Sequence, residues 1–447
     1  MPAETGASPC NNVVRSAYLI FAPCAVGPSR TNLHRWLFHQ AVHLVGGSMN
    51  AVRSLKMRTQ VGIIGAGPAG LFLSHLLHRA GIECVVVEAQ SRPYVEGRVR
   101  AGVLEPGTME TLEMLGLDAR MRREGMVDEG LDIRFRGKNI HLDLPGLTGK
   151  RVMIYGQQEV VKDLIGARLE ASQPLLFEAK VSRLSDLDGD RPKIHFSHDG
   201  RDEVLECDYI AGCDGFHGVS RQAPPPGHII NYERVYDFAW LGVLSRSRPL
   251  GDMTYSNSDR GFALCSRRSN AVSRLYLQID ANDDHTSWSD DRFWGELHAR
   301  MFDEDRTEIV EGEIFQRDIA RLRSFVASPM QYGRLLLAGD AVHITPPAGA
   351  KGLNLAVADV RVMAAALIEF YRTGNKSRLN GYSEKCLDRV WRTVRFATML
   401  TGLLHRFPEH SAFERNLQLT ELECILGSRA AQTTIAEQYV GTPLDLT

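Results

Sequence analysis

The chain has 447 residues, of which 44% are hydrophobic and 24% are charged, and its formal net charge is -2. This length allows two domains with cores of their own, and the near-neutral charge argues against nucleic acid or a membrane surface as a partner. No apolar run reaches the ~20 residues of a membrane helix, and none of the eight cysteines forms a C-x-x-C pair. We therefore expect a globular cytoplasmic protein with free thiols and no metal site.

Residues 1–56 differ from the rest of the chain in charge. They contain five basic residues and one acid, whereas the remainder contains 47 basic and 53 acidic residues. Leaders rich in arginine and poor in acids can be organelle transit peptides. However, Met57 opens the stretch MRTQVGIIGAGPAG, in which a strand is expected almost at once. We predict that residues 1–56 are a disordered extension or the product of an upstream start, with a transit peptide and a functional extension as alternatives.

A glycine-rich stretch follows, QVGIIGAGPAGLFLSHLLHRAGIECVVVE, and its pattern predicts a strand, a tight turn, a helix and a second strand. Gly65, Gly67 and Gly70 fit G-x-G-x-x-G, in which the glycines permit the turn, the approach of a pyrophosphate and close packing of helix on strand. The helix N-terminus offers free N–H groups to phosphates. Glu88 ends the second strand, where a carboxylate can bind ribose hydroxyls. The stretch predicts a dinucleotide site, and it does not separate FAD from NAD.

Two later stretches end predicted strands with an acidic residue beside a glycine. In CDYIAGCDGFHGVSR, Asp214 is followed by His217 and Arg221, which suits a loop near a phosphate-bearing ligand and equally a surface turn. In RLLLAGDAVHITPPAGAKGLN, Asp340 follows the strand and can accept a hydrogen bond from a polyol hydroxyl.

The segment after that second acid predicts a rigid wall and a helix start. Pro346 and Pro347 fix φ and remove N–H donors, and Gly349 and Gly352 allow the backbone to pass close to a ligand. A helix is expected over 353–371, and its free N–H groups would stabilise negative charge on a reduced flavin ring. We interpret this segment as one wall of a flavin site.

The stretch RGFALCSRRSNAVSRLYLQID predicts a β-hairpin with its turn at 269–271. Because side chains alternate along a strand, Ser266 and Arg268 share one face of the first strand, and Arg274 and Tyr276 share a face of the second. Guanidinium groups bind carboxylates bidentately, and hydroxyls can complete the shell. A solvated polar face is the alternative interpretation of this hairpin.

These motifs, together with GRVRAGVLEPGT, YGQQEV, LHRFP and AEQYVG, resemble the single-component FAD aromatic hydroxylases, and among them the 4-hydroxybenzoate 3-monooxygenases. The resemblance runs from about Met57 to Pro443. It implies FAD as cofactor, NADPH as co-substrate with NADH as the alternative, and O2 as oxidant. It also implies a homodimer that hydroxylates 4-hydroxybenzoate to 3,4-dihydroxybenzoate through a flavin C4a-hydroperoxide.

The resemblance implies a role for each residue of the substrate site. The residues matching Ser266, Arg268 and Tyr276 hold the substrate carboxylate, with Arg268 as the main clamp. Tyr255 matches a tyrosine that contacts the phenol, and Tyr439 matches the next member of a proton relay. The relay serves the chemistry because a phenolate donates electron density to the oxidant better than a phenol does. Pro347 matches a position whose carbonyl contacts the substrate oxygen.

The resemblance also implies two further sets of contacts. In addition to the three glycines, Glu88 and Asp340, the FAD contacts are Arg98, Arg100, Gln157, Gly352, Leu353, Asn354 and Arg274. Because the chain has no second glycine-rich motif, NAD(P)H is expected to bind transiently at the surface, and ordinary surface cations are the alternative. The residues implied are Gln90 and Tyr94, which favour NADPH, and the positively charged His217, Arg221 and Arg323.

Three positions depart from the family pattern. Asp128 stands where a histidine commonly ends the relay, Ala89 replaces a frequent arginine, and Ala348 replaces a frequent threonine. Either Asp128 accepts the proton or the relay leaves by another route. We predict that Asp128→Ala slows substrate deprotonation less than Tyr439→Phe does.

We predict an α/β fold in three parts. A Rossmann-like FAD-binding domain with a parallel sheet occupies 57–230, a mixed, largely antiparallel substrate-binding sheet occupies 231–330, and the Gly-Asp flavin segment with C-terminal helices occupies 331–447. Two other functions remain open, namely hydroxylation of a related aromatic acid such as 4-aminobenzoate and a flavin-binding redox sensor without hydroxylase activity. A flavin halogenase is disfavoured because the sequence W-x-W-x-I-P is absent.

Overall fold

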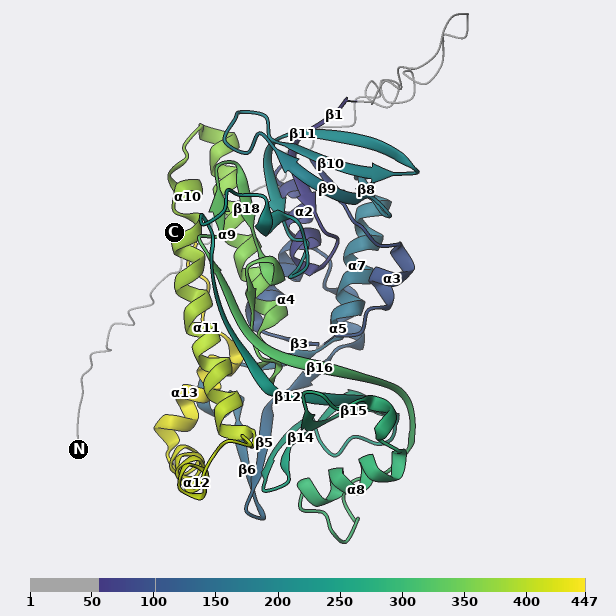
Figure 1. Ribbon diagram of the computed structural model, residues 1–447, viewed down its shortest axis with the longest axis vertical. Coiled ribbons are helices and arrows are strands. Elements are labelled where there is room, and N and C mark those ends of the chain that lie inside the picture. The colour runs from purple at the N-terminus through teal and green to yellow at the C-terminus, as the bar shows by residue number, and fades with distance from the viewer. Residues whose placement is uncertain (1–55, 101, 447) are drawn as a thin grey trace, which may run out of the picture. The chain divides into compact units, whose positions relative to one another are not determined.

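The computed structural model describes residues 56–100 and 102–446, and these contain two large sheets and a small one (Figure 1). The expected extension, residues 1–56, lies outside the described residues apart from Lys56, at which β1 begins. No helix in the described part is long and apolar enough to cross a membrane. The cysteines of this part are free thiols, and all of them are buried except Cys424.

The first sheet brings the three predicted cofactor stretches to one edge. At its centre, β1 pairs in parallel with β11 and β2, and β18 pairs in parallel with β11. The glycine-rich turn, the Asp214 loop and the Gly339-Asp340 turn therefore all follow the carboxyl ends of neighbouring strands, which is where open α/β sheets bind ligands. The strands in order are β17 (Gln331–Tyr332), β18 (Leu335–Leu337), β11 (Arg201–Gly212), β1 (Lys56–Ile64), β2 (Cys84–Val87) and β8 (Leu175–Leu176), with β10 (Lys193–His198) and β9 (Lys180–Ser185) continuing from β11.

Several helices pack around this first sheet. α2 (Pro68–Arg79) starts directly after the glycine-rich turn, with Pro68 in its first turn, where proline needs no N–H partner. Leu71, Leu73 and Leu77 are buried, and α2 packs against α9 (Gly352–Thr373) and α7 (Gln157–Glu170). The other helices before the second sheet are α3 (Arg92–Gly97), α4 (Pro106–Leu115), α5 (Ala119–Glu124) and α6 (Leu144–Thr148), with the short η1 (Ser220–Gln222).

The second sheet is largely antiparallel, as predicted, and β13 and β5 form a parallel pair within it. Its two long strands, β12 and β16, run side by side (Figure 1). The strands in order are β19 (His343–Ile344), β16 (Glu313–Ser328), β12 (Ile230–Arg246), β15 (Val272–Asp280), β14 (Gly261–Ser269), β13 (Met253–Ser258), β5 (Gly130–Phe135) and β6 (Lys138–Asp143). The hairpin β5–β6 comes from within the predicted FAD-binding segment, so the substrate sheet draws on residues outside 231–330, and the predicted domain limits remain predictions.

The remaining elements are a small sheet, the C-terminal helices and several shorter helices. A small sheet consists of β3 (Val103–Leu104), β7 (Val152–Ile154) and β4 (Met126–Asp128). The C-terminal part, after α10 (Ser377–Asn380), is helical, and its members are α11 (Tyr382–Leu404), α12 (Ala412–Gly427) and α13 (Arg429–Val440). The rest are α8 (Asp290–Arg300), η2 (His285–Ser287), η3 (Gly339–Ala341) and η4 (Pro347–Gly349).

Candidate active site

The glycine-rich turn after β1 has the geometry of a phosphate-binding turn. Gly65 has φ +102°, which a residue with a side chain rarely adopts. A Cβ on Gly70 would lie 2.0 Å from the carbonyl oxygen of Gly65, so glycine is required where the helix packs on the turn. A Cβ on Gly67 would meet no protein atom within 4 Å. The one open position is therefore the one through which a pyrophosphate would approach, and the turn fits FAD.

Glu88 lies at the end of the second strand, as predicted, and its carboxylate also holds the glycine-rich turn in place. Its Oε2 accepts a 2.7 Å hydrogen bond from the N–H of Ala66, and its Oε1 accepts one of 2.8 Å from Gln90. Each carboxylate oxygen keeps a second acceptor site. Glu88 can thus bind a ribose while it links the ends of β1 and β2.

The Gly339-Asp340 turn is tied to the Asp214 loop by Arg221. The guanidinium of Arg221 donates to the carbonyl oxygens of Ala341, at 2.7 Å, and Phe216, at 2.8 Å. Asp340 is exposed, and its carboxylate makes no hydrogen bond to the described protein. The turn therefore presents a rigidly supported, free carboxylate, which suits a ribityl hydroxyl.

Among the other predicted FAD contacts, Arg100 is drawn into the same region. Burial lowers the pKa of Arg100, Arg98 lowers it further, and the carboxylates of Asp340 and Asp318 oppose the shift. Both Arg98 and Arg100 are exposed by accessible surface. Gln157 is half-buried at the first position of α7.

At the start of α9, the backbone N–H groups are available to a ligand, whereas the Asn354 side chain is not. Gly352 and Leu353 open the helix, and their N–H groups precede the first intrahelical bond, which Leu355 donates to Lys351. The Asn354 side chain is used within the protein, since its oxygen accepts from Glu105 and Thr108 and its nitrogen donates to the carbonyls of Val103 and Ala350. Only the backbone of residue 354 is thus available to a ligand.

The predicted hairpin is β14–β15, and it contains a β-bulge that the alternation rule does not reveal. The pairing shifts between Arg267 and Ser269, so Arg268 has no partner in the ladder. A bulge turns a side chain out of the regular alternation. Ser266 lies opposite Arg274, and its hydroxyl donates to the Arg274 carbonyl at 3.0 Å.

Arg268 is half-buried and forms no ion pair with any described residue. Burial lowers its pKa, the nearby Tyr276 opposes this shift, and the positive charge of Arg274 adds to it. A guanidinium held next to a second one is a site for an anion. Arg274 is buried, pairs with Asp318, and lies over the ring of Tyr276 at 4.9 Å.

Tyr255, Tyr439 and Asp128 form a buried cluster from three separate elements. Tyr255 on β13 is 1% exposed and donates a 2.7 Å hydrogen bond to the carbonyl of Ala348 in η4. Tyr439 on α13 is also buried, and its hydroxyl has no hydrogen-bond partner in the described protein. Burial raises the pKa of both tyrosines, and the Asp128 carboxylate raises both further.

Asp128 has the properties of a proton acceptor. It is fully buried, and burial raises its pKa to about 7. Its Oδ1 accepts from the N–H of Gly130 at 3.1 Å, whereas its Oδ2 is buried without a partner among the described residues. Asp128, the residue that departs from the family pattern, thus belongs to the buried cluster with Tyr255 and Tyr439. Pro347 is exposed, and its carbonyl accepts from Ala350 at 2.9 Å, which leaves one acceptor site for a ligand.

Two buried groups near this cluster were not singled out from the sequence. Lys351 donates to Glu105 at 2.6 Å and to the carbonyl of Tyr439 at 2.8 Å, which ties the end of α13 to the start of α9. His405 lies beneath the hairpin, stacked on Phe262 with ring centroids 4.2 Å apart, and accepts from the Trp240 indole at 2.7 Å. Burial lowers the His405 pKa to about 3, so this ring is neutral. The LHRFP motif contained His405, but its spacing gives no sign of a stacking role.

The residues predicted for NAD(P)H fall into two places. Gln90 and Tyr94 are exposed on and next to α3. Arg221 and Arg323 both lie over the ring of Phe216, at 4.9 and 4.5 Å, and the exposed His217 meets the same ring edge-on. Arg323 also pairs with Glu233 at 3.0 Å.

These contacts limit the hydrogen bonds and the charge with which Arg221 and Arg323 can bind a nucleotide. The hydrogen bonds of Arg221 are directed to backbone carbonyls, and the charge of Arg323 is partly neutralised. Neither His217 nor Arg221 forms an ion pair with a described residue, and the His217 side chain is exposed. No cluster of His, Cys, Asp and Glu side chains in the described part could hold a metal ion.

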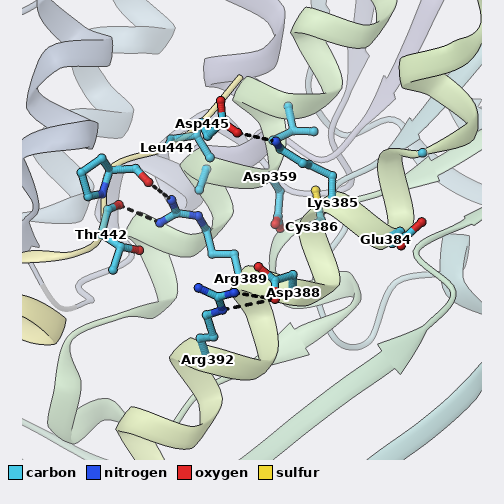
Figure 2. Close-up of a pocket in the computed structure, with 14 residues that line it drawn as sticks. Asp359, Glu384, Lys385, Cys386, Asp388, Arg389, Arg392, Thr442, Leu444 and Asp445 are labelled. Atoms are coloured by element: carbon cyan, nitrogen blue, oxygen red, sulfur yellow. Dashed lines mark hydrogen bonds and ion pairs between the residues drawn. The ribbon is translucent and has the colours of Figure 1, made fainter. Parts of the chain in front are cut away.

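Away from this site, a cavity of about 510 Å³ lies between α11 and residues 442–445 (Figure 2). Figure 2 shows Arg389 donating to the carbonyl of Thr442, and Lys385 paired with Asp445. Arg389 also donates to the carbonyl of Pro443. None of the residues predicted for FAD or substrate lines this cavity. Its walls anchor the segment that follows α13, and so help to hold the helix that carries Tyr439.

Comparison with known proteins agrees with this geometry. A family described as an FAD binding domain matches residues 58–397. The p-hydroxybenzoate hydroxylase of Acinetobacter baylyi is 48% identical over 392 residues, which cover 87% of this chain and 97% of the relative. A 3-(3-hydroxy-phenyl)propionate/3-hydroxycinnamic acid hydroxylase of Mycobacterium avium is 24% identical over 67% of this chain and 53% of that protein.

Solved structures share the fold at low identity. The p-nitrophenol 4-monooxygenase PnpA from Pseudomonas putida DLL-E4 has a TM-score of 0.74 at 19% identity, covering 87% of this chain and 100% of that one. CmlS, a flavin-dependent halogenase, has a TM-score of 0.68 at 19% identity, covering 85% of this chain and 72% of that one. The fold class predicted from the sequence is thus confirmed, but the fold alone does not separate hydroxylases from halogenases.

Proposed function

Because this chain belongs to the FAD-binding family that includes p-hydroxybenzoate hydroxylase, we propose that it hydroxylates 4-hydroxybenzoate at the 3 position, with NADPH and O2, to give 3,4-dihydroxybenzoate. The observation that carries this proposal is a site with two chemically different ends. Arg268, a guanidinium without an acid partner, lies at one end. The buried Tyr255, Tyr439 and Asp128 lie at the other.

The sheet register supports a para-substituted ring between these ends. Tyr255 on β13 pairs with Leu264 on β14, and Leu264 pairs with Tyr276 on β15. Directly paired residues point to the same face of a sheet. Tyr255 and Tyr276 therefore face the same side two strand spacings apart, which is about 10 Å. A benzene ring with a carboxylate and a hydroxyl on opposite carbons fits this separation.

At the carboxylate end, Arg268 would bind the substrate's acid group, with the hydroxyls of Ser266 and Tyr276 completing its shell. Charge-assisted hydrogen bonds of this kind are stronger than neutral ones. The positive charge of Arg274 adds attraction from the neighbouring strand. The positive charge of Arg274, which helps to lower the pKa of Arg268, supports the assignment, because a bound anion would offset the repulsion between the two guanidinium groups.

At the phenol end, Tyr255 would turn its hydroxyl from the Ala348 carbonyl toward Tyr439, accept the substrate's proton and pass its own to the relay. Tyr439 would carry the proton onward, and Asp128 would receive it at its unpartnered Oδ2. A carboxylate with a pKa of about 7 can exchange a proton near neutral pH. Because all three groups are buried, the proton leaves without opening the ring site to water.

Bound FAD supplies the redox chemistry, accepting a hydride from NADPH and activating O2 for transfer of one oxygen atom to the ring. The chain's part is to hold it. The turn at Gly65, Gly67 and Gly70 would bind the pyrophosphate, Glu88 the ribose, and Asp340 the ribityl chain. The N–H groups at the start of α9 would stabilise negative charge on the ring.

Two finer statements complete the proposal. NADPH would bind at the surface through Gln90, Tyr94, His217, Arg221 and Arg323. The protein would act as a cytoplasmic homodimer, which light scattering on the purified FAD-loaded protein tests through its mass.

Substrate specificity gives the test of the proposal. NADPH oxidation by the FAD-loaded protein is measured with 4-hydroxybenzoate, 4-aminobenzoate, benzoate and no addition, and products are identified by chromatography. We expect strong stimulation and a hydroxylated product with 4-hydroxybenzoate. Stimulation confined to 4-aminobenzoate would replace the substrate, and bound FAD without stimulation by any acid would favour the redox sensor.

A further inference from the structure

Arg274 is held by a carboxylate that has no assigned part in the site. One of its nitrogens, Nη2, donates to both oxygens of Asp318, at 2.8 and 2.9 Å. Arg274 lies on β15 and Asp318 on β16, and β12 runs between these two strands. The ion pair therefore crosses over a strand of the sheet.

This crossing depends on Gly242 in the intervening strand. Gly242 pairs with Tyr276 on one side and with Asp318 on the other. A Cβ at Gly242 would lie 2.7 Å from Oδ1 of Asp318 and 2.7 Å from Cε1 of Tyr276. Both neighbouring side chains thus use the space that a side chain at 242 would fill, so glycine there admits the ion pair.

Arg274 also has hydrogen-bonding capacity that the described protein does not use. Its side chain is 4% exposed, and Nε and Nη1 are buried without a partner among the described residues. Buried N–H groups without an acceptor are rare in folded proteins and call for a ligand or a water molecule. Since the guanidinium lies beside Arg268 and Tyr276, these groups border the predicted substrate site.

We propose that Asp318 is a positioning residue, which fixes the guanidinium of Arg274 so that Nε and Nη1 bind an acceptor oxygen of a ligand. That oxygen belongs either to the carboxylate of the aromatic acid or to the flavin ring. This inference rests on the proposed function of the site.

The proposal predicts that removing the charge of Asp318 lowers the rate of turnover without weakening substrate binding. Asp318→Asn keeps the shape but removes the charge that holds Arg274 in one orientation. The net positive charge of the site rises, so affinity for an aromatic acid is maintained or improved. The ring is then poorly aligned for reaction, and alignment contributes to rate rather than to affinity.

The test compares Asp318→Asn and Asp318→Glu in the FAD-loaded protein. A matched control is Glu313→Gln, which removes an exposed carboxylate paired with Arg246 on the same strands β16 and β12. Measured are kcat and KM for 4-hydroxybenzoate, the product formed per NADPH, the flavin absorbance change on adding the acid, and the melting temperature.

We expect Asp318→Asn to lower kcat about tenfold or more at a temperature where the protein stays folded, with KM unchanged or lower and an altered flavin absorbance change. Its melting temperature falls, because the buried Arg274 loses its charged partner. Asp318→Glu restores most of kcat, and Glu313→Gln matches the wild type. A wild-type kcat in Asp318→Asn would overturn the proposal, as would a loss of kcat explained by a lower melting temperature that Asp318→Glu does not restore.

The measurements distinguish a failure of the proposed function from a failure of the positioning role of Asp318. A wild-type protein without acid-stimulated NADPH oxidation contradicts the proposed function itself. In that case, titration of FAD into the apoprotein still tests Arg274. Weaker FAD binding in Asp318→Asn than in Glu313→Gln places the acceptor oxygen on the flavin, and equal FAD binding together with an unaltered flavin spectrum contradicts the positioning role.

Discussion

The hydroxyl of Tyr255 donates a 2.7 Å hydrogen bond to the backbone carbonyl of Ala348. This bond joins β13 of the second sheet to the turn that follows the Gly-Asp segment of the first. The two sheets carry different parts of the site, since one holds the substrate floor and the other the FAD turns. The contact therefore sets the distance between the predicted proton relay and the predicted flavin wall.

The glycine turn predicts opposite outcomes for two alanine variants. Gly67→Ala places a Cβ in open space, so the apoprotein should keep its melting temperature and bind FAD more weakly. Gly70→Ala places a Cβ 2.0 Å from the Gly65 carbonyl and should lower the stability of the apoprotein itself. Thermal unfolding and FAD titration check both. Equal FAD affinity of Gly67→Ala and the wild type would refute a phosphate site at this turn.

Arg268→Lys should weaken binding of 4-hydroxybenzoate by about 10- to 100-fold, because the planar fork that binds a carboxylate bidentately is lost while the charge remains. The adjacent Arg267→Lys is the matched control, since Arg267 is committed to an ion pair with Asp252 at 2.8 Å. Dissociation constants come from the flavin difference spectrum. Similar effects of the two variants would remove Arg268 as the carboxylate clamp.

The relay predicts an order of effects among three variants. Tyr439→Phe should slow substrate deprotonation by about 100-fold or more, because it removes the hydroxyl proposed to link Tyr255 with Asp128. Asp128→Ala should slow it less, since water can replace a terminal acceptor. Tyr236→Phe is the control, as Tyr236 is buried in the same apolar cluster but contacts Ser324. Stopped-flow absorbance of the bound phenolate measures the rates, and slowing by Asp128→Ala that equals or exceeds that of Tyr439→Phe would exclude this order.

Asp128 should also make stability depend on pH. Burial raises its folded-state pKa to about 7, whereas its unfolded pKa is about 3.9. The folded state holds this proton more tightly, so the associated stability is fully present below about pH 4 and is lost as pH rises through 7.

Asp128→Asn removes this loss. Between pH 4 and pH 8 its free energy of unfolding should rise relative to the wild type, by at most about 4 kcal/mol for a shift of three pKa units. Urea unfolding across this pH range measures the difference. Parallel pH curves for the two proteins would mean that Asp128 titrates normally.

The nucleotide preference is testable without mutagenesis. Gln90 and Tyr94 predict a lower KM for NADPH than for NADH, although Arg92, which could compensate for Ala89, pairs with Glu96 at 2.7 Å. His217 is exposed and carries no ion pair in the described part, so His217→Gln should raise the KM for NADPH more than Arg323→Gln does. A lower KM for NADH would overturn the preference.

Local patterns in the sequence predicted the parts of the fold that depend on neighbouring residues. The glycine turn, Glu88 at the end of β2 and the helix start near Gly352 follow from spacing and backbone chemistry, and each lies where it was predicted. The hairpin was also predicted, but not its bulge at Arg268, because strand alternation assumes an unbroken ladder.

The remaining features depend on pairing between distant segments. Nothing near 130–143 indicates that β5 pairs with β13, more than a hundred residues later. The ion pair of Arg274 and Asp318 depends on a third residue, Gly242, in the strand between them. The raised pKa of Asp128 likewise arises from burial beneath elements remote in sequence. Such relationships are set by topology, and only the folded chain displays them.

Product accounting tests the central claim most directly. The FAD-loaded protein is given a limiting amount of NADPH in air-saturated buffer with excess 4-hydroxybenzoate, and 3,4-dihydroxybenzoate, hydrogen peroxide and NADPH are quantified together. The site described here predicts nearly one molecule of 3,4-dihydroxybenzoate per NADPH and little peroxide. NADPH oxidation that yields peroxide without 3,4-dihydroxybenzoate would contradict the claim that this chain hydroxylates 4-hydroxybenzoate.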